Sequence, residues 1–359
     1  MWQIILKNLQ EPATRSLLMF RSSRFEEACK MKKIITVLLT GLLLVTVIAG
    51  CGAASGSTAS TGGGGKAKIL LIMNDVTDTF RGQLADAVTS AATSSGATVD
   101  LVETGGSVEM EAELVATAAS KGYTAIILRP SDASTALQMN VAAGNLPIIY
   151  VNNQPSDEHL TADKYIYAGS SEEQAGQLQA EYVLKKLGNP SSLNVIIFEG
   201  EQGHSATIGR TNAVIKTLKE NGCNATYVFK DYANWSDTEA EYKLGIFMKT
   251  GQSVDAVFCN NDTMALGVIS GMKKYGLDYT KIPVCGVDAT ADGCESISSG
   301  EMAFTVLQSA AGQGASAVKA AIALGSGGTI EGIDYATEDH KCIYVPFESV
   351  DASNVSQYK

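Results

Sequence analysis

The stretch AVFCNNDTMALGVISGMKK (256–274) decides the fold class of this chain. Its opening AVFC is apolar and suits a short buried strand, and residues 263–274 have the apolar spacing of an amphipathic helix. The polar turn NND (260–262) lies between them. A strand followed directly by a helix is the repeating unit of parallel sheets that are covered by helices.

The same alternation of strands and helices continues on both sides of this unit. The other expected strands are 68–73, 98–103, 125–128, 147–151, 194–198, 226–230, 283–287 and 303–307. The other expected helices are 79–95, 107–121, 134–143, 171–187, 205–221, 238–249 and 310–324. About ten strands are too many for one compact open sheet in a chain of this length. The pattern therefore predicts an α/β fold with two doubly wound parallel-sheet lobes.

Composition and charge exclude several classes of protein. Apolar residues make up 45% of the chain and charged residues 18%, with 35 Gly and only 7 Pro, so the chain can bury a core and is neither disordered nor collagen-like. Residues 1–50 hold seven of the 27 basic and three of the 38 acidic residues, which leaves a net charge of −15 for the rest. Without a basic patch, nucleic acid is not an expected partner.

The N-terminus has the pattern of an export signal. Met31 and two lysines precede an apolar run over 34–50, and we expect Met31 to be the true start. The run ends in IAGC (48–51), which resembles the bacterial lipobox. That resemblance implies cleavage before Cys51, lipidation of its thiol and an extracytoplasmic protein anchored to the cell membrane. An uncleaved membrane anchor is the alternative.

A Gly/Ser-rich segment, 51–65, follows the leader (1–50) and is expected to be a flexible tether. Beyond Cys51 the cysteines are odd in number and form no C-x-x-C motif, so neither a disulfide framework nor a zinc site is indicated. Cys259 and Cys285 fall inside apolar strands and suit core positions. We expect no metal and no cofactor.

Polar residues gather where the expected strands end. In open α/β sheets, ligands bind beyond the carboxyl ends of the strands. The residues found there include carboxylates, amides, one histidine and two aromatic rings, and no strand is followed by a glycine-rich phosphate loop. Amides and carboxylates pair well with vicinal hydroxyls, and aromatic rings pack on the C–H faces of a sugar. The set favours a neutral polyol ligand.

Five motifs together resemble the galactose/glucose-binding proteins of bacterial sugar importers, which belong with the ribose-binding proteins to the type I periplasmic binding proteins. They are GEQGHSATIGR (200–210), NWSDTEA (234–240), CNNDTMALG (259–267), CGVDA (285–289) and FTVLQ (304–308). The resemblance covers nearly all of 66–359. It implies a three-strand hinge with crossings near Gly169, Leu307 and Tyr344, an N-terminal lobe of 66–169 plus 308–343, and a C-terminal lobe of 170–307 plus 344–359.

The resemblance also implies a binding site and partners. A pyranose would lie between Phe80 and Trp235. Its hydroxyls would bond to the remaining site residues, Asp78, Asn152, His204, Arg210, Asn261 and Asp288, with Gln308 also in the cleft. The loaded protein would deliver the monosaccharide to the membrane permease and ATPase of an ABC importer, which are separate chains. A chemoreceptor is a further candidate partner.

Three positions depart from the family pattern. Ala206 stands where the family has a second carboxylate near the histidine, and Gln308 replaces an asparagine. The calcium loop of the family would fall near 188–193, where this chain has no carboxylate, so calcium is not expected. These departures leave the sugar open, with ribose, a nucleoside or a furanose-like signal as alternatives.

Other interpretations remain open at this stage. Asp78, His204 and Asp288 are placed to cap helices, Asn152 and Asn261 to end strands, and Phe80 and Trp235 to pack in a core. A glycoside-acting enzyme could use Asp78, Asp288 and Glu199 as acid–base carboxylates. A sugar-responsive repressor would need an N-terminal helix-turn-helix, but an export signal occupies that place.

Overall fold

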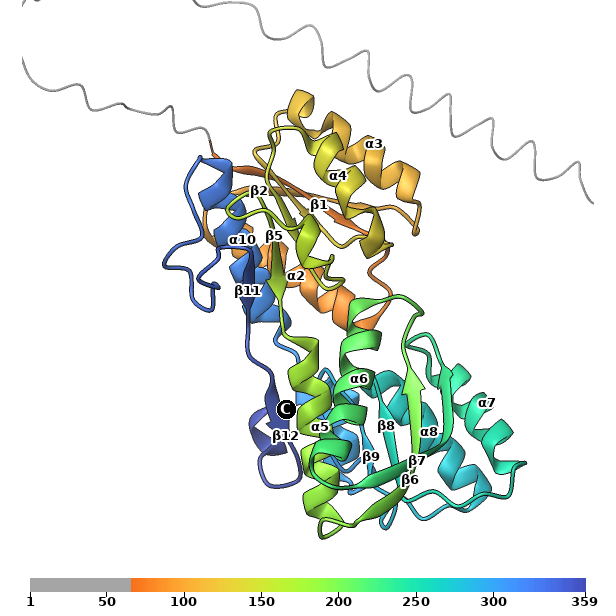
Figure 1. Ribbon diagram of the computed structural model, residues 1–359. Helices are drawn as coiled ribbons and strands as arrows, with labels where there is room; N and C mark the ends of the chain where they lie inside the picture. Colours follow the sequence, from red (N-terminus) through yellow and green to blue (C-terminus); the bar gives the residue numbers. More distant parts are fainter. Residues whose placement is uncertain (1–65) are drawn as a thin grey trace, which may run out of the picture. The chain divides into compact units, whose positions relative to one another are not determined.

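The computed structural model describes residues 66–359, and the expected two-lobe α/β architecture is confirmed (Figure 1). The expected leader, the tether and Cys51 lie outside the described residues. Within 66–359, none of the helices is both long and apolar enough to cross a membrane.

The N-terminal lobe is built on a six-stranded parallel sheet of order β11-β5-β4-β3-β1-β2. Its strands are β1 (Lys68–Met73), β2 (Thr98–Glu103), β3 (Ala125–Leu128), β4 (Ile148–Tyr150), β5 (Tyr165–Gly169) and β11 (Cys342–Tyr344). Helices α2 (Thr79–Ser94) and α10 (Ala310–Gly325) cover one face, and α3 (Val108–Ala118) and α4 (Ala136–Ala143) cover the other (Figure 1). Both faces are buried, which explains the continuous apolar runs of β1, β3 and β4.

The C-terminal lobe is built on a four-stranded parallel sheet of order β7-β6-β8-β9. Its strands are β6 (Ser192–Glu199), β7 (Asn224–Tyr232), β8 (Ala256–Cys259) and β9 (Val284–Cys285). Helices α5 (Glu172–Lys186) and α6 (Ser205–Glu220) pack on one face, and α7 (Asp237–Met248), α8 (Asp262–Tyr275) and α9 (Ala291–Ser298) lie on the other (Figure 1). Cys259 and Cys285 are fully buried in this core, as expected.

Three strands end at the residues where the crossings between lobes were expected. β5 ends at Gly169, β10 (Thr305–Leu307) at Leu307 and β11 at Tyr344. The Val345 amide donates a hydrogen bond of 2.8 Å to the Gly169 carbonyl, so two of these segments run side by side. β10 pairs antiparallel with β12 (Glu348–Val350) in a small separate sheet. The lobe boundaries given above stay a prediction.

Several short elements were not expected from the sequence. They are strands β5, β11 and β12, helix α9, and the single 3-10 turns Asp157–His159 and Val355–Gln357. The 3-10 turns Ala119–Lys121 and Ala133–Thr135 lie at the ends of the expected helices 107–121 and 134–143. Strands β11 and β12 have three residues each and α9 has about two turns, which are too few to show a period. Strand β5 has five residues, as many as some expected strands, and was missed.

Candidate functional site

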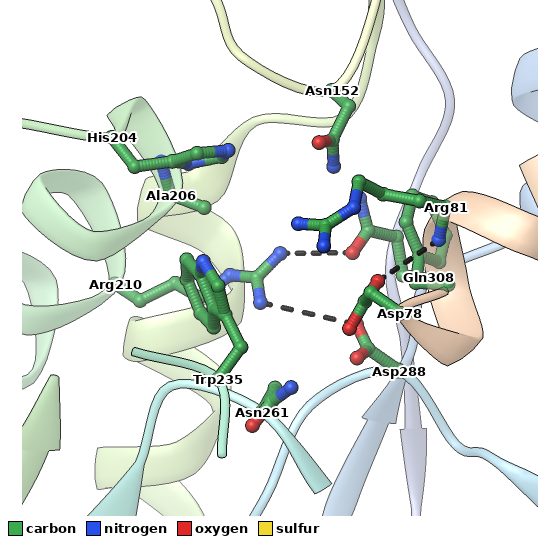
Figure 2. A pocket seen from close by; sticks show the side chains of 11 residues that line it. Asp78, Arg81, Asn152, His204, Ala206, Arg210, Trp235, Asn261, Asp288 and Gln308 are labelled. Carbon is green, nitrogen blue, oxygen red and sulfur yellow. Dashed lines mark hydrogen bonds and ion pairs between the residues drawn. The ribbon is translucent and has the colours of Figure 1, made fainter. Parts of the chain in front are cut away.

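The cleft at the carboxyl ends of the strands brings all nine predicted binding residues together (Figure 2). The empty space in the cleft is about 310 Å³, a volume that also counts the solvent-filled space at its open mouth. Its lining is Asp78, Phe80, Arg81, Asn152, His204, Ala206, Arg210, Trp235, Asn261, Asp288 and Gln308. Arg81 was not among the predicted binding residues, and Ala206 was noted only as a departure from the family pattern.

Three amides in the cleft are oriented by hydrogen bonds to their oxygens. The Oδ1 of Asn152 accepts from Arg129 Nε at 3.3 Å, and the Oδ1 of Asn261 accepts from the Met264 amide at 3.0 Å. The Oε1 of Gln308 accepts from Arg210 Nη2 at 2.9 Å, and its Nε2 is buried without a hydrogen-bond partner within 66–359. With each oxygen engaged, the NH₂ groups remain available as donors to a ligand.

His204 is a neutral donor in the cleft. Its Nδ1 accepts a hydrogen bond of 3.1 Å from the Ala206 amide, which places the ring proton on Nε2. Burial lowers the pKa of His204 well below its ordinary value, and the nearby guanidinium groups of Arg129, Arg210 and Arg81 lower it further. The imidazole therefore presents one N–H and no charge.

Arg210 is the centre of a buried network. Its Nε lies 2.7 Å from Glu172 Oε2, Nη1 donates to the Asn260 carbonyl at 2.6 Å, and Nη2 donates to Gln308. Burial acts against its charge, but the carboxylates of Glu172 and Asp288 raise the net pKa of Arg210 above its usual value. The Arg210 side chain is 3% exposed, and two of its hydrogen bonds go to Glu172 and the Asn260 carbonyl, which do not line the cleft. The guanidinium is therefore held in one orientation at the edge of the cleft.

The two carboxylates of the cleft face it from different lobes. Asp78 caps α2, with Oδ1 accepting from the Arg81 amide at 3.0 Å, and one oxygen remains for a ligand. Asp288 lies 3.9 Å from Arg210 Nη1 and is 7% exposed. Burial raises the pKa of Asp288 well above the usual range, opposed by Arg210. Ligand hydroxyls that donate to this carboxylate would favour its charged form.

Trp235 is held in place by its neighbours. Its ring packs so closely on Gly200 that a Cβ there would lie 2.1 Å from Trp235 ring atoms, which explains why glycine occupies that position. The ring also meets His204 edge-on, with centroids 5.3 Å apart. Phe80, by contrast, is 3% exposed and belongs to the core under α2. The two aromatics therefore differ, since Trp235 presents ring surface and Phe80 is mostly core.

Three of the nine non-glycine residues with positive φ within 66–359 line the cleft. Asn152 (φ 61°), Trp235 (φ 63°) and Asp288 (φ 116°) all have positive φ, which non-glycine residues rarely adopt. Strained residues of this kind persist where surrounding structure fixes them, and they gather at functional sites.

The cap and core interpretations turn out not to compete with a binding role. Asp78, His204 and Asn261 cap α2, α6 and α8 and also line the cleft. Helices that start at the carboxyl ends of parallel strands place their caps where ligands bind. Glu199, the third carboxylate of the enzyme alternative, instead pairs with Lys230 at 3.2 Å and does not line the cleft.

Sequence reasoning missed four charged residues around the cleft. Glu172 pairs with Arg210, and Arg129, Glu201 and Arg81 form ion pairs across the lobes. Arg129 directly follows β3, so it lies at the same strand ends as the predicted residues of this lobe and was visible in the sequence. Arg81 lies next to Phe80 in the first turn of α2, and only the packing turns its side chain into the cleft.

Comparison with known proteins gives a consistent picture. A family model described as a periplasmic binding protein domain matches residues 69–329. A protein of Rhizobium meliloti, provisionally assigned to rhizopine binding, is 30% identical over 66% of this chain and 74% of its own length. The D-galactose/methyl-galactoside binding periplasmic protein of Haemophilus influenzae is 26% identical over 67% of this chain and 75% of its own.

Among solved structures, an ABC transporter solute binding protein from Bacillus halodurans C-125 with bound myo-inositol superposes with a TM-score of 0.73. It is 28% identical and covers 83% of this chain and 99% of its own.

Proposed function

Because the chain belongs to the periplasmic binding protein domain family, it is a sugar-type solute-binding protein of ABC importers and not an enzyme, and we propose that it captures a monosaccharide of the galactose/glucose type. The sugar would lie in the cleft between the lobes. Contacts to both lobes would favour closure of the cleft around the ligand. The importer can then distinguish the closed, loaded protein from the open, empty one.

The arrangement of donors and acceptors in the cleft supports this proposal. The NH₂ groups of Asn152, Asn261 and Gln308 and the Nε2–H of His204 are donors, and the Asp78 and Asp288 carboxylates are acceptors. A hydroxyl both donates and accepts, so a ring with several hydroxyls satisfies both kinds of group at once. Trp235 offers ring surface for the C–H face of the sugar.

A cyclitol is the second candidate ligand. Ala206 replaces the second carboxylate expected for hexose binding, and the Bacillus halodurans protein was solved with myo-inositol. Polar groups surround the cleft from both lobes, which suits a ring with a hydroxyl on every carbon. Ribose, a nucleoside and a furanose-like signal are the alternatives ranked below the hexose and the cyclitol.

Calorimetric titration of the purified protein tests the ligand class. D-galactose, D-glucose, myo-inositol, D-ribose and a nucleoside should be compared after ligand retained from expression has been removed by unfolding and refolding. We expect a galactose/glucose-type hexose to bind most tightly. Tighter binding of myo-inositol would select the cyclitol, and a protein that binds none of these polyols would contradict the proposal.

We also propose that Cys51 carries the lipid that anchors the protein to the outer side of the cell membrane. Cys51→Ser should abolish lipidation and release the protein from the membrane fraction, because the thiol that would carry the lipid is removed. Membrane association and mass that are unchanged by the substitution would contradict the anchor. Cys223→Ser, at a buried position in the C-terminal lobe, is the control for loss of a thiol.

A further inference from the structure

Arg81 is a cationic residue in the cleft that none of the predicted contacts includes. It lies in the first turn of α2, and its side chain is 11% exposed. Figure 2 shows its guanidinium directed into the cleft, between Asn152 and the Arg210–Gln308 pair. Its position therefore requires an explanation beyond surface solvation.

The guanidinium is held from two sides. Its Nη2 lies 3.0 Å from Asp75 Oδ1 in the N-terminal lobe, and its Nη1 lies 3.7 Å from Glu201 Oε1 in the C-terminal lobe. Its Nε is buried and has no hydrogen-bond partner among residues 66–359. A buried charged donor without a partner is costly, so an oxygen acceptor is expected at this point of the cleft.

Glu201 is shared between two arginines. Its other oxygen lies 3.1 Å from Arg129 Nη2, and Arg129 is 1% exposed and also donates to Asn152. Glu201 is 36% exposed, so its charge is partly screened by solvent and only part of it is available to Arg81. Arg81 consequently keeps positive potential towards the cleft.

We propose that Arg81 binds the ligand directly, donating from Nε to a ring hydroxyl oxygen, and that Glu201 positions Arg81 from the opposite lobe. This inference rests on the proposed polyol-binding function and names a contact within that site. It also restricts the ligand: the substituent facing Arg81 is an oxygen, because an ammonium group there would meet a fixed cation.

The test uses two substitutions of Arg81 and the polyol that binds the parent protein. Arg81→Lys keeps a cation near Asp75 but has no Nε–H, and Arg81→Met removes the charge at similar length. Charged hydrogen bonds typically contribute tenfold or more in affinity, so we expect about a tenfold loss with either variant by calorimetry. The ligand analogue that lacks the hydroxyl facing Arg81 should lose little further affinity in Arg81→Met.

The role of Glu201 is tested by a second cycle. Glu201→Gln should weaken binding several-fold in the parent protein and by a smaller factor in Arg81→Met, because Glu201 acts partly through Arg81 and partly through Arg129 and Asn152. Glu301→Gln, which removes one partner of an exposed ion pair with Lys273, is the matched control and should leave affinity unchanged. Urea unfolding of each variant shows whether the fold is intact.

Three outcomes would overturn the inference. Unchanged or tighter binding by folded Arg81 variants would mean that Arg81 only fills the cleft. If Arg81→Met lowers the affinity for every deoxy analogue by the same factor as for the complete ligand, Arg81 does not contact the ring. An effect of Glu201→Gln that is equally large in Arg81→Met would assign Glu201 to Arg129 alone. If the parent protein binds no polyol, the proposed function fails and this inference with it, whereas the other outcomes leave that function intact.

Discussion

The two halves of the cleft are built differently. In the C-terminal half, Arg210 is fixed by Glu172, Asn260 and Gln308, all of which are buried. In the N-terminal half, Asn152 is oriented by Arg129, whose charge partner Glu201 belongs to the other lobe. The C-terminal half is therefore fixed by its own core and hinge, and the N-terminal half depends on contact between the lobes.

Asp262 adds to this difference. Its carboxylate accepts hydrogen bonds from the Thr290 amide at 2.8 Å and the Thr305 hydroxyl at 2.5 Å, and its amide donates to the Val287 carbonyl. These bonds connect the turn after β8, which carries Asn261, to the turn after β9, which carries Asp288.

The largest expected effect is on the buried ion pair of the C-terminal half. Arg210→Met should lower the free energy of unfolding by about 3–5 kcal/mol, because Glu172 is left buried without its partner. Urea unfolding measures the loss. Arg81→Met in the other half should cost at most about 1 kcal/mol, since its partner Asp75 is partly exposed. Equal losses in the two variants would contradict the difference between the halves.

Phe80 should behave as a core residue of the N-terminal half. Phe80→Ala is expected to lower the free energy of unfolding by about 3 kcal/mol, because a side chain packed among buried residues leaves a cavity. Phe80→Leu, which keeps most of the apolar volume, is the control and should retain most of the stability. A stable Phe80→Ala protein with weakened binding would instead assign Phe80 mainly to the ligand.

Asp288 should matter for affinity more than for stability. Asp288→Ala leaves ligand hydroxyls without an acceptor, and a loss of about 1.5–3 kcal/mol per lost bond is expected in calorimetry. Asp288→Asn keeps the shape and one acceptor oxygen and should lose less. Additive losses between Asp288→Ala and deoxy analogues of the ligand would show that the carboxylate does not contact the sugar.

Trp235 provides the counterpart to Phe80. Trp235→Ala removes a ring that lines the cleft and should weaken ligand binding by at least about 1.4 kcal/mol, which is tenfold, with little loss of fold. Trp235→Phe should recover part of the affinity, because a smaller ring still offers an apolar face. Unfolding of Trp235→Ala would show that this ring, like Phe80, is needed by the core.

The smallest effect concerns pH and the turn network of the C-terminal half. Burial raises the pKa of Asp262 to about 7, against its hydrogen bonds from Thr305 and Thr290. A carboxyl whose pKa is raised by folding stabilises the protonated folded state, so this contribution is complete below about pH 4 and is lost progressively as pH rises to the folded pKa of about 7.

Between pH 6 and pH 8, where the last part of this contribution is lost, the free energy of unfolding should therefore fall by about 1.4 kcal/mol in total. The lowered pKa of His204 has the opposite sign but acts below its ordinary value of 6.5. Asp262→Asn should flatten the profile in urea titrations at each pH. A stability that rises over this range in the parent protein would show that Asp262 is charged in the fold.

Much of the candidate site was visible in the sequence because it follows a rule of the fold. The strands of one parallel sheet end at the same edge, so Asn261 and Asp288 could be assigned to one site before their distances were known. Asn152 follows a strand of the other sheet, and the family resemblance assigned it to the same cleft. The short strands β5, β11 and β12 could not be found in this way. Strands β11 and β12 have too few residues for a period, and their pairing partners are far away in the chain. Strand β5 is longer and pairs with its chain neighbour β4, but no residue of the candidate site follows it directly.

The sequence by itself determined the α/β class, the edge of the sheets that carries the site and the helix caps that line it, since these depend on local periods and on residues next to strand ends. Tertiary structure alone decided the orientation of Arg81 and the Arg129–Glu201 pair, whose members are 72 residues apart in the chain. It also turned the amide oxygens of Asn152 and Gln308 towards arginines. The physical reason is that burial and ion pairing across lobes depend on distances that no local pattern encodes.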